Sequence, residues 1–187
     1  MFINRKQVGK AMAKTDSFFI RVALPLNTTG AGSGDFLQVP IDLGAYVDAL
    51  GKSVLRIHNI AVQYSDSAGG APNVTGGSPA STIWQLTTQS QTAPVIVGDN
   101  KSVVASGRLI AYNQDTTTGI PSYVSDNLDV APQHWTQGYL IGVESMYLSG
   151  EGSSTGWSED VTISLIMECT SETLTQAAAM ALALSQQ

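Results

Sequence analysis

The sequence contains little charge. Asp, Glu, Lys and Arg make up 13% of its 187 residues, whereas about a quarter is usual in globular proteins. Ser, Thr, Gly, Gln and Asn take their place. Disorder is excluded, because 43% of the chain is hydrophobic and these residues occur in patterned runs. This composition indicates a β-protein with polar loops, or a protein whose surface is largely covered by partners.

Cysteine and histidine are nearly absent. Cys169 is the single cysteine, which excludes a disulfide framework and a cysteine-based metal site. A catalytic serine needs a base, and only His58 and His134 are available. No Gly-x-Ser-x-Gly elbow surrounds any serine. We therefore expect no nucleophilic catalysis, and we expect Cys169 to be a buried, inert thiol.

The acidic residues are scattered along the chain. Glu159 with Asp160, and Asp126 with Asp129, are the two pairs that a glycosidase mechanism would use. Both pairs lie at predicted loop–strand boundaries, where carboxylates are ordinarily solvated. Calcium requires a denser cluster of oxygen ligands. We expect no enzymatic activity, no cofactor and no metal.

Long apolar runs are also lacking. No run approaches the roughly 18 residues that a membrane-spanning helix needs. Residues 1–14 contain no apolar core of the kind found in secretory signal peptides. We therefore expect neither a transmembrane segment nor secretion through a signal peptide.

The few positive charges are unevenly placed. Arg5, Lys6, Lys10 and Lys14 lie in the first 15 residues, which contain no acidic residue. Since the whole chain carries a net charge of −6, the remaining residues carry −10. A basic N-terminal arm on an acidic body predicts an anionic partner for the arm; the alternative is a merely solvated terminus. No basic stripe interleaves with aromatic residues, so any contact with nucleic acid would be non-specific and made by the arm.

The clearest predicted element is a strand at residues 160–169. Apolar and polar residues alternate along it with the period of two that a half-buried strand requires. Similar strands recur between turns rich in Gly, Pro and Asn, and we count eight to ten candidates. This pattern predicts an antiparallel sandwich or barrel. Besides 160–169, the main candidate strands are residues 18–24, 54–64, 83–88, 102–112 and 139–148.

The strand at residues 54–64 changes phase. Leu55 and Ile57 share one face, whereas Ile60 and Val62 belong to the opposite phase. The change at His58 and Asn59 predicts a β-bulge. At a bulge, we expect His58 to be a structural, hydrogen-bonded histidine.

Two short helices are predicted. In the first, Leu43, Tyr46, Val47 and Leu50 have helical spacing after Asp42, a candidate N-cap. The second is the Ala-rich tail, for which Thr173 and Gln176 match a capping box. We expect one face of this tail helix to contain Leu174, Ala178, Ala181 and Leu182, with Met180 and Leu184 flanking it. A nearly uncharged helix of this length is marginal in water, so it must pack on its own sandwich or on a neighbouring subunit.

The tryptophans allow a second hypothesis. Trp135 and Trp157 could stack on sugar rings, together with His134 and Tyr139. The alternative is that the tryptophans are core residues or anchor loops.

The layout as a whole resembles single jelly-roll capsid proteins of icosahedral viruses. The resemblance lies in the basic arm (residues 1–15), the all-β body (16–170), its long Gly/Pro/Ser loops and the helical tail (171–187). It implies an antiparallel β-sandwich of jelly-roll type, here with a short inserted helix and a C-terminal helix.

The resemblance also implies a function: self-assembly into a virion shell. The partners would be copies of the chain and other virion proteins. The arm would contact the shell interior, either nucleic acid or an internal membrane, and the tail would make inter-subunit contacts through Leu174, Met180, Leu182 and Leu184. A carbohydrate-binding or adhesin-like module, with Trp135 and Trp157 as its site, remains open, as does a tail or fibre component.

Overall fold

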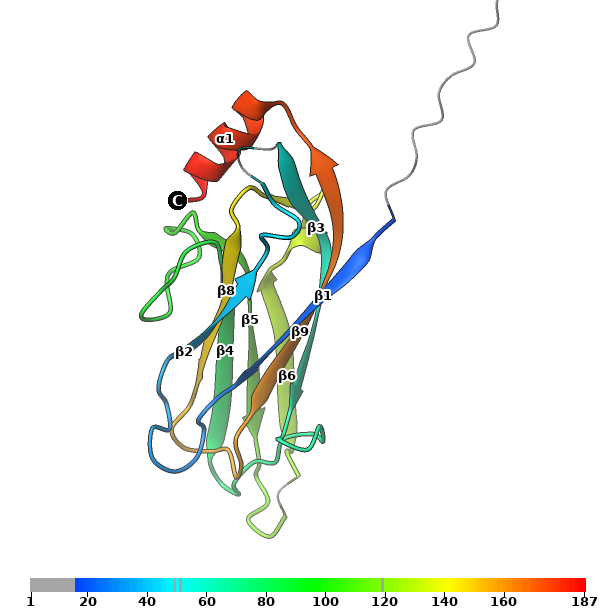
Figure 1. The fold of residues 1–187 in the computed structure, drawn as a ribbon. Helices are drawn as coiled ribbons and strands as arrows, with labels where there is room; N and C mark the ends of the chain where they lie inside the picture. The colour runs from blue at the N-terminus through cyan, green and yellow to red at the C-terminus, as the bar shows by residue number, and fades with distance from the viewer. Residues whose placement is uncertain (1–15, 49, 51, 119) are drawn as a thin grey trace, which may run out of the picture.

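The protein is an antiparallel β-sandwich with a helix, α1, at its C-terminal end (Figure 1). The computed structural model describes residues 16–48, 50, 52–118 and 120–187. One sheet has the order β1-β9-β3-β7 and the other β2-β8-β4-β5-β6, so the predicted sandwich is confirmed. The elements are β1 (Phe18–Pro25), β2 (Leu37–Asp42), β3 (Ser53–Ser65), β4 (Pro79–Thr87), β5 (Val103–Tyr112), β6 (Tyr123–Val130), the 3-10 turn η1 (Pro132–His134), β7 (Tyr139–Ile141), β8 (Ser145–Gly152), β9 (Thr162–Thr173) and α1 (Gln176–Ser185).

The chain passes repeatedly from one sheet to the other. Strands β1, β3, β7 and β9 form the first sheet, and the strands between them belong to the second. Only β4, β5 and β6 follow one another within a single sheet, where they pair as antiparallel neighbours. Sequence neighbours therefore face each other across the core, and most pairing within a sheet joins distant parts of the chain.

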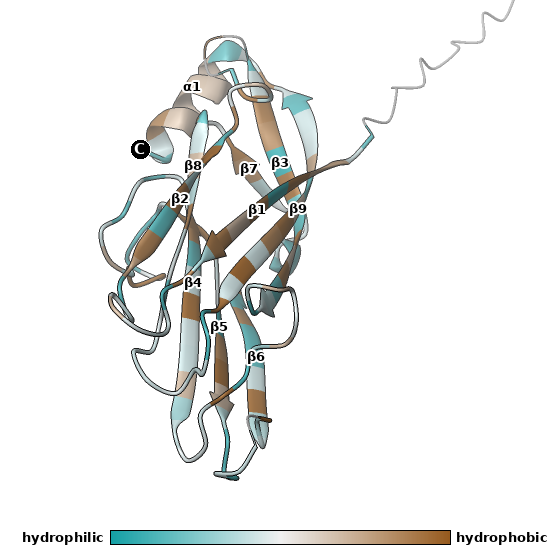
Figure 2. Cartoon of the chain, turned by 60° about the horizontal axis from the view of Figure 1, so that its bottom comes forward, coloured by the Kyte–Doolittle hydropathy of each residue, from teal (hydrophilic) through white to brown (hydrophobic). Residues whose placement is uncertain are grey.

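Strand β9 is the centre of its sheet. It pairs with β1 on one side and with β3 on the other. Val161 and the inward residues Ile163, Leu165, Met167 and Cys169 are fully buried, as the alternation predicted, and the alternation is visible as colour bands along β9 (Figure 2). Burial raises the pKa of the Cys169 thiol to about 12, which keeps this thiol protonated and unreactive at neutral pH.

The bulge predicted in β3 is confirmed. The register between β3 and β9 shifts between Ile57 and Asn59. At this point the Nε2 atom of His58 lies 2.8 Å from the Thr170 hydroxyl. The histidine thus links the two strands where their ladder is interrupted.

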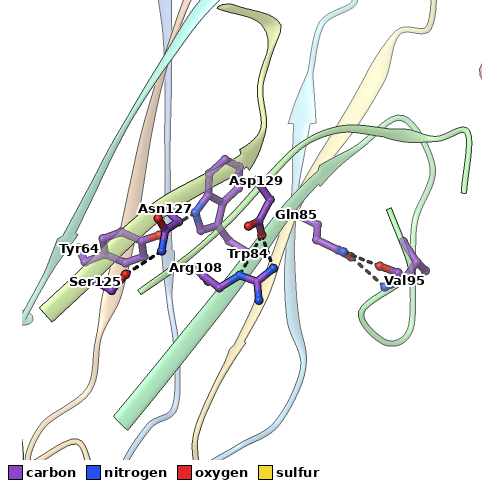
Figure 3. A network of polar contacts seen from close by, with 8 residues as sticks. All are labelled: Tyr64, Trp84, Gln85, Val95, Arg108, Ser125, Asn127 and Asp129. Atoms are coloured by element: carbon purple, nitrogen blue, oxygen red, sulfur yellow. Dashed lines mark hydrogen bonds and ion pairs between the residues drawn. The ribbon is translucent and has the colours of Figure 1, made fainter. Parts of the chain in front are cut away.

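Trp84 is the largest fully buried side chain of the core. It projects from β4 between the sheets, and its Nε1 donates a hydrogen bond to the Tyr64 hydroxyl at 2.9 Å (Figure 3). A second, smaller apolar cluster lies beside the main core and is formed by Val74, Ala80, Leu109, Ala111, Trp157 and Val161. The first sheet contributes Tyr64 to this cluster, so the two sheets are joined at both places.

The prediction of a short inserted helix after Asp42 is wrong. The described residues of this segment form a turn in which the Val47 N–H donates to the Leu43 carbonyl at 2.9 Å. Asp42 does cap it, because its Oδ1 accepts from the Gly44 N–H. Asp48 then bridges to Ser53 at the start of β3. This turn buries Leu43 and Val47, whereas Tyr46 and Leu50 of the predicted apolar face are exposed.

Two strand predictions also need correction. Residues 139–148 form two strands in different sheets, β7 and β8, separated by a break that begins at Gly142. The apolar run is continuous because both strands contribute to the main core, Ile141 from the first sheet and Met146 and Leu148 from the second. Strand β6 was not predicted, because it is an edge strand whose polar residues hide the alternation.

No helix in the described part of the chain is long and apolar enough to span a membrane.

Candidate functional site

The N-cap of helix α1 lies two residues later than predicted. Thr175 is the N-cap, and its hydroxyl accepts a hydrogen bond from the Ala178 N–H at 3.3 Å. The predicted cap, Thr173, is instead the last residue of β9 and pairs with Ser53. The tail therefore continues the central strand before it turns into the helix.

The helix packs through its alanines. Ala179 and Ala183, one turn apart, are buried, whereas Ala178 and Ala181 of the predicted face are exposed. The reason lies on the sandwich: a Cβ added to Gly142 would be 3.0 Å from the Leu182 Cγ and 3.1 Å from the Ala183 nitrogen. The backbones approach so closely that only small side chains fit between them.

Gln186 fastens the end of the helix to the sandwich. Its side-chain Nε2 donates to the Leu140 carbonyl at 2.7 Å, and its Oε1 accepts from the Gly142 N–H at 2.8 Å. Its backbone carbonyl accepts from the Thr88 hydroxyl at 2.7 Å. Gln186 thereby connects the helix to both sheets. Sequence reasoning missed this residue, since a glutamine following a helix carries no distinctive local signal.

Replacing Gln186 by Ala is expected to destabilise the protein by about 2–3 kcal/mol, because the Leu140 and Gly142 backbone groups lose their partners. The variant should also show faster amide exchange at Gly142. Urea unfolding and hydrogen exchange measure the two effects. Gln187→Ala is the control, because Gln187 is exposed; equal stability of the two variants would contradict the anchoring role.

The outward side of α1 is apolar and uncharged. Met180 is 43% and Leu184 67% exposed, and the helix contains no charged residue. Of the other tail residues predicted at an interface, Leu174 and Leu182 are half-buried. Figure 1 shows that α1 lies at one end of the sandwich. We call the exposed side chains of Met180 and Leu184 the helix surface.

The two tryptophans of the carbohydrate hypothesis have different environments. Trp157 is buried in the second apolar cluster, and its Nε1 donates to the Ser81 carbonyl at 3.1 Å. At 4% exposure, this side chain is not a surface platform for a sugar ring, contrary to that hypothesis. Trp135, directly after η1, is 54% exposed.

The acidic pair Glu159 and Asp160 holds loops in place. Asp160 Oδ1 accepts hydrogen bonds from the Thr28 N–H and from the N–H and hydroxyl of Thr29, at 2.8–3.0 Å. These bonds, chiefly those from Thr29, lower the pKa of Asp160. Glu159 accepts from the Asn73 N–H. Such contacts fix the β8–β9 connection against its neighbours.

Ion pairs in the described residues join neighbouring strands. Arg56 of β3 makes a two-pronged contact with Glu172 of β9 and also donates to the Gln137 carbonyl. Hydrogen bonding raises the pKa of Arg56 and lowers that of Glu172. Arg108 pairs with Asp129 at 2.8 Å on the exposed face of β5 and β6 (Figure 3).

Among the described residues, no three or more His, Cys, Asp or Glu side chains gather where they could hold a metal ion. The basic residues Arg5, Lys6, Lys10 and Lys14 of the predicted arm lie outside the described residues.

Comparisons with known proteins give little for this chain. No protein-family model matches it, and no curated protein matches it. Among solved structures, a chain of Desmodium yellow mottle tymovirus aligns over 95% of this chain and 94% of its own length, with 11% sequence identity and a TM-score of 0.28.

Proposed function

We propose that this chain is a structural capsid protein that assembles with copies of itself into a virion shell. Its role is to form contacts and not to catalyse a reaction. The helix surface carries this proposal: it is an apolar, uncharged patch on a helix held to both sheets by Gln186.

The connectivity supports the proposal. The orders β1-β9-β3-β7 and β2-β8-β4-β5, with the chain passing between facing sheets, match the two Greek keys of a jelly roll, to which β6 adds an edge strand. Jelly rolls occur in viral capsids, but also in lectins and enzymes, so the fold alone does not decide the function.

The surface composition favours assembly over the alternatives. Large apolar side chains are exposed on several elements, while charge is scarce over the whole chain. The residues that become buried at the core of a protein–protein interface are poor in charge and rich in Met and aromatic side chains. Besides Met180 and Leu184, the most exposed of these side chains are Leu50, Ile96, Ile120 and Tyr123.

The basic arm has a secondary role in the proposal. Arg5, Lys6, Lys10 and Lys14 would face the shell interior and contact nucleic acid or an internal membrane. Four charges give only a weak, salt-sensitive attraction to phosphates. The arm therefore assists assembly, while the apolar contacts of the folded body drive it.

Electron microscopy and sedimentation velocity of the purified full-length chain test the proposal. We expect closed particles of uniform size, with assembly increasing with protein and salt concentration, because salt screens the repulsion between acidic bodies. A chain that stays strictly monomeric across these conditions would contradict it.

A further inference from the structure

The edge of β3 is open over half of its length. Strand β7 pairs with β3 only at Leu55–Ile57. Beyond the bulge, β7 no longer runs beside β3, and the side chain of Gln133 occupies the next pairing position on this edge. Its Oε1 accepts from the Ile60 N–H at 3.1 Å, and its Nε2 donates to the Ile60 carbonyl at 3.0 Å. One amide side chain thus satisfies both backbone groups, as a residue of a neighbouring strand would.

The next positions of this edge have no such partner. Because backbone direction alternates along a strand, the N–H and carbonyl groups of Val62 and Tyr64 point to the same side as those of Ile60, away from β9. Within the part of the chain that the structure describes, no hydrogen bond reaches these groups. The edge therefore offers two consecutive pairing positions to an added strand.

A cavity of about 290 Å³ lies directly beside these positions. It opens over the second apolar cluster, between β3 of one sheet and β5 and β6 of the other. Its lining is mainly apolar and includes Val62, Pro72, Leu109, Pro121, Val124 and Trp157. A side chain of an added strand that points toward the core would enter this cavity.

Two polar groups line the same cavity. Asp126 is opposite Leu109 in the β5–β6 ladder and so faces the inner side of the sheet. No hydrogen bond or ion pair to its carboxylate is present among the described residues, and partial burial raises its pKa. The Tyr64 hydroxyl accepts from Trp84 and keeps its own proton for donation (Figure 3).

We propose that this edge binds an extended peptide segment of a partner protein by strand addition to β3. The peptide would pair with Val62 and Tyr64, insert one apolar side chain into the cavity, and place a Lys or Arg two residues away against Asp126. Residues two apart in a strand share a face, so one peptide satisfies both demands. Asp126 lies on β6 of the facing sheet, at the rim of the cavity, so its carboxylate favours a basic residue in the added strand.

Synthetic peptides and the full-length chain test this proposal. The probe is acetylated, amidated Thr-Ile-Thr-Lys-Thr, compared by calorimetry with versions that carry Glu for Lys, Thr for Ile, or N-methyl groups on the pairing side. We expect binding of the first peptide only. Titration should change the fluorescence of Trp157, which lines the cavity.

A pair of protein variants locates the site. Asp126→Asn should weaken binding of the lysine peptide about five-fold, the size expected for a partly exposed ion pair. Asp16→Asn removes the same charge at an exposed position outside the strands and should leave binding unchanged.

Three results would overturn the proposal. Equal binding of the lysine and glutamate peptides would remove the role of Asp126. Undiminished binding of the N-methylated peptide would show that the cavity takes a small apolar ligand without strand pairing. Absence of binding by every peptide would show that the edge is closed to strands.

Discussion

A chain carrying both Met180→Glu and Leu184→Glu is expected to fold normally but to remain unassembled. Both side chains are exposed in the folded chain, so the substitutions should change the free energy of unfolding by less than about 0.5 kcal/mol. In a contact between subunits, each unpaired carboxylate would cost about 2–5 kcal/mol. Association should therefore weaken by more than about a hundred-fold.

Sedimentation velocity and urea unfolding of the same preparations separate assembly from folding. Met180→Leu with Leu184→Met preserves the apolar surface and should assemble normally. Gln176→Glu is the control for added negative charge. It places a carboxylate at the helix N-terminus, where the helix dipole favours it, and it should leave both folding and assembly normal. Normal particles from the double glutamate variant would show that the helix surface is not an interface, whatever the chain otherwise assembles into.

The largest loss of stability is expected for Trp84→Ala, at about 3–5 kcal/mol. This side chain is fully buried and fills the space between the sheets. Its removal also takes the indole N–H from the Tyr64 hydroxyl. Since domains of this kind have only about 5–15 kcal/mol of stability, the variant should be partly unfolded near body temperature.

Urea unfolding followed by circular dichroism measures the loss. Trp135→Ala is the matched control: it deletes the same side chain at an exposed position and should change stability by less than about 0.5 kcal/mol. A similar loss in both variants would mean that Trp84 is not the centre of the core.

The sequence contained enough information for features set by local alternation. Strand β9 was predictable because its inward residues are all apolar over five alternations. The bulge at His58 was predictable because the phase of the pattern itself changes there. In both places, the pattern of apolar residues within a single strand is enough to make the prediction.

Features set by tertiary contact were not predictable. The break at Gly142 depends on the close approach of α1, which no neighbouring residue announces. The buried face of α1 was misassigned because backbone proximity selects Ala179 and Ala183 over larger residues. For the edge of β3, the decisive facts are a short β7 and a distant glutamine, Gln133. Sequence periodicity indicates which residues of one element are buried, but not which other element packs on them.

The central position of β9 has a consequence for how the chain folds. Strands β1 and β3 both pair with β9 and not with each other, and nearly the whole chain separates Phe18 from its partner Cys169. During synthesis, the first sheet therefore lacks its middle until the final strand leaves the ribosome. Topologies dominated by such distant pairings fold slowly. The unpaired strands must stay apart in the meantime, and the window for misassembly between nascent copies closes only when the last strand is inserted.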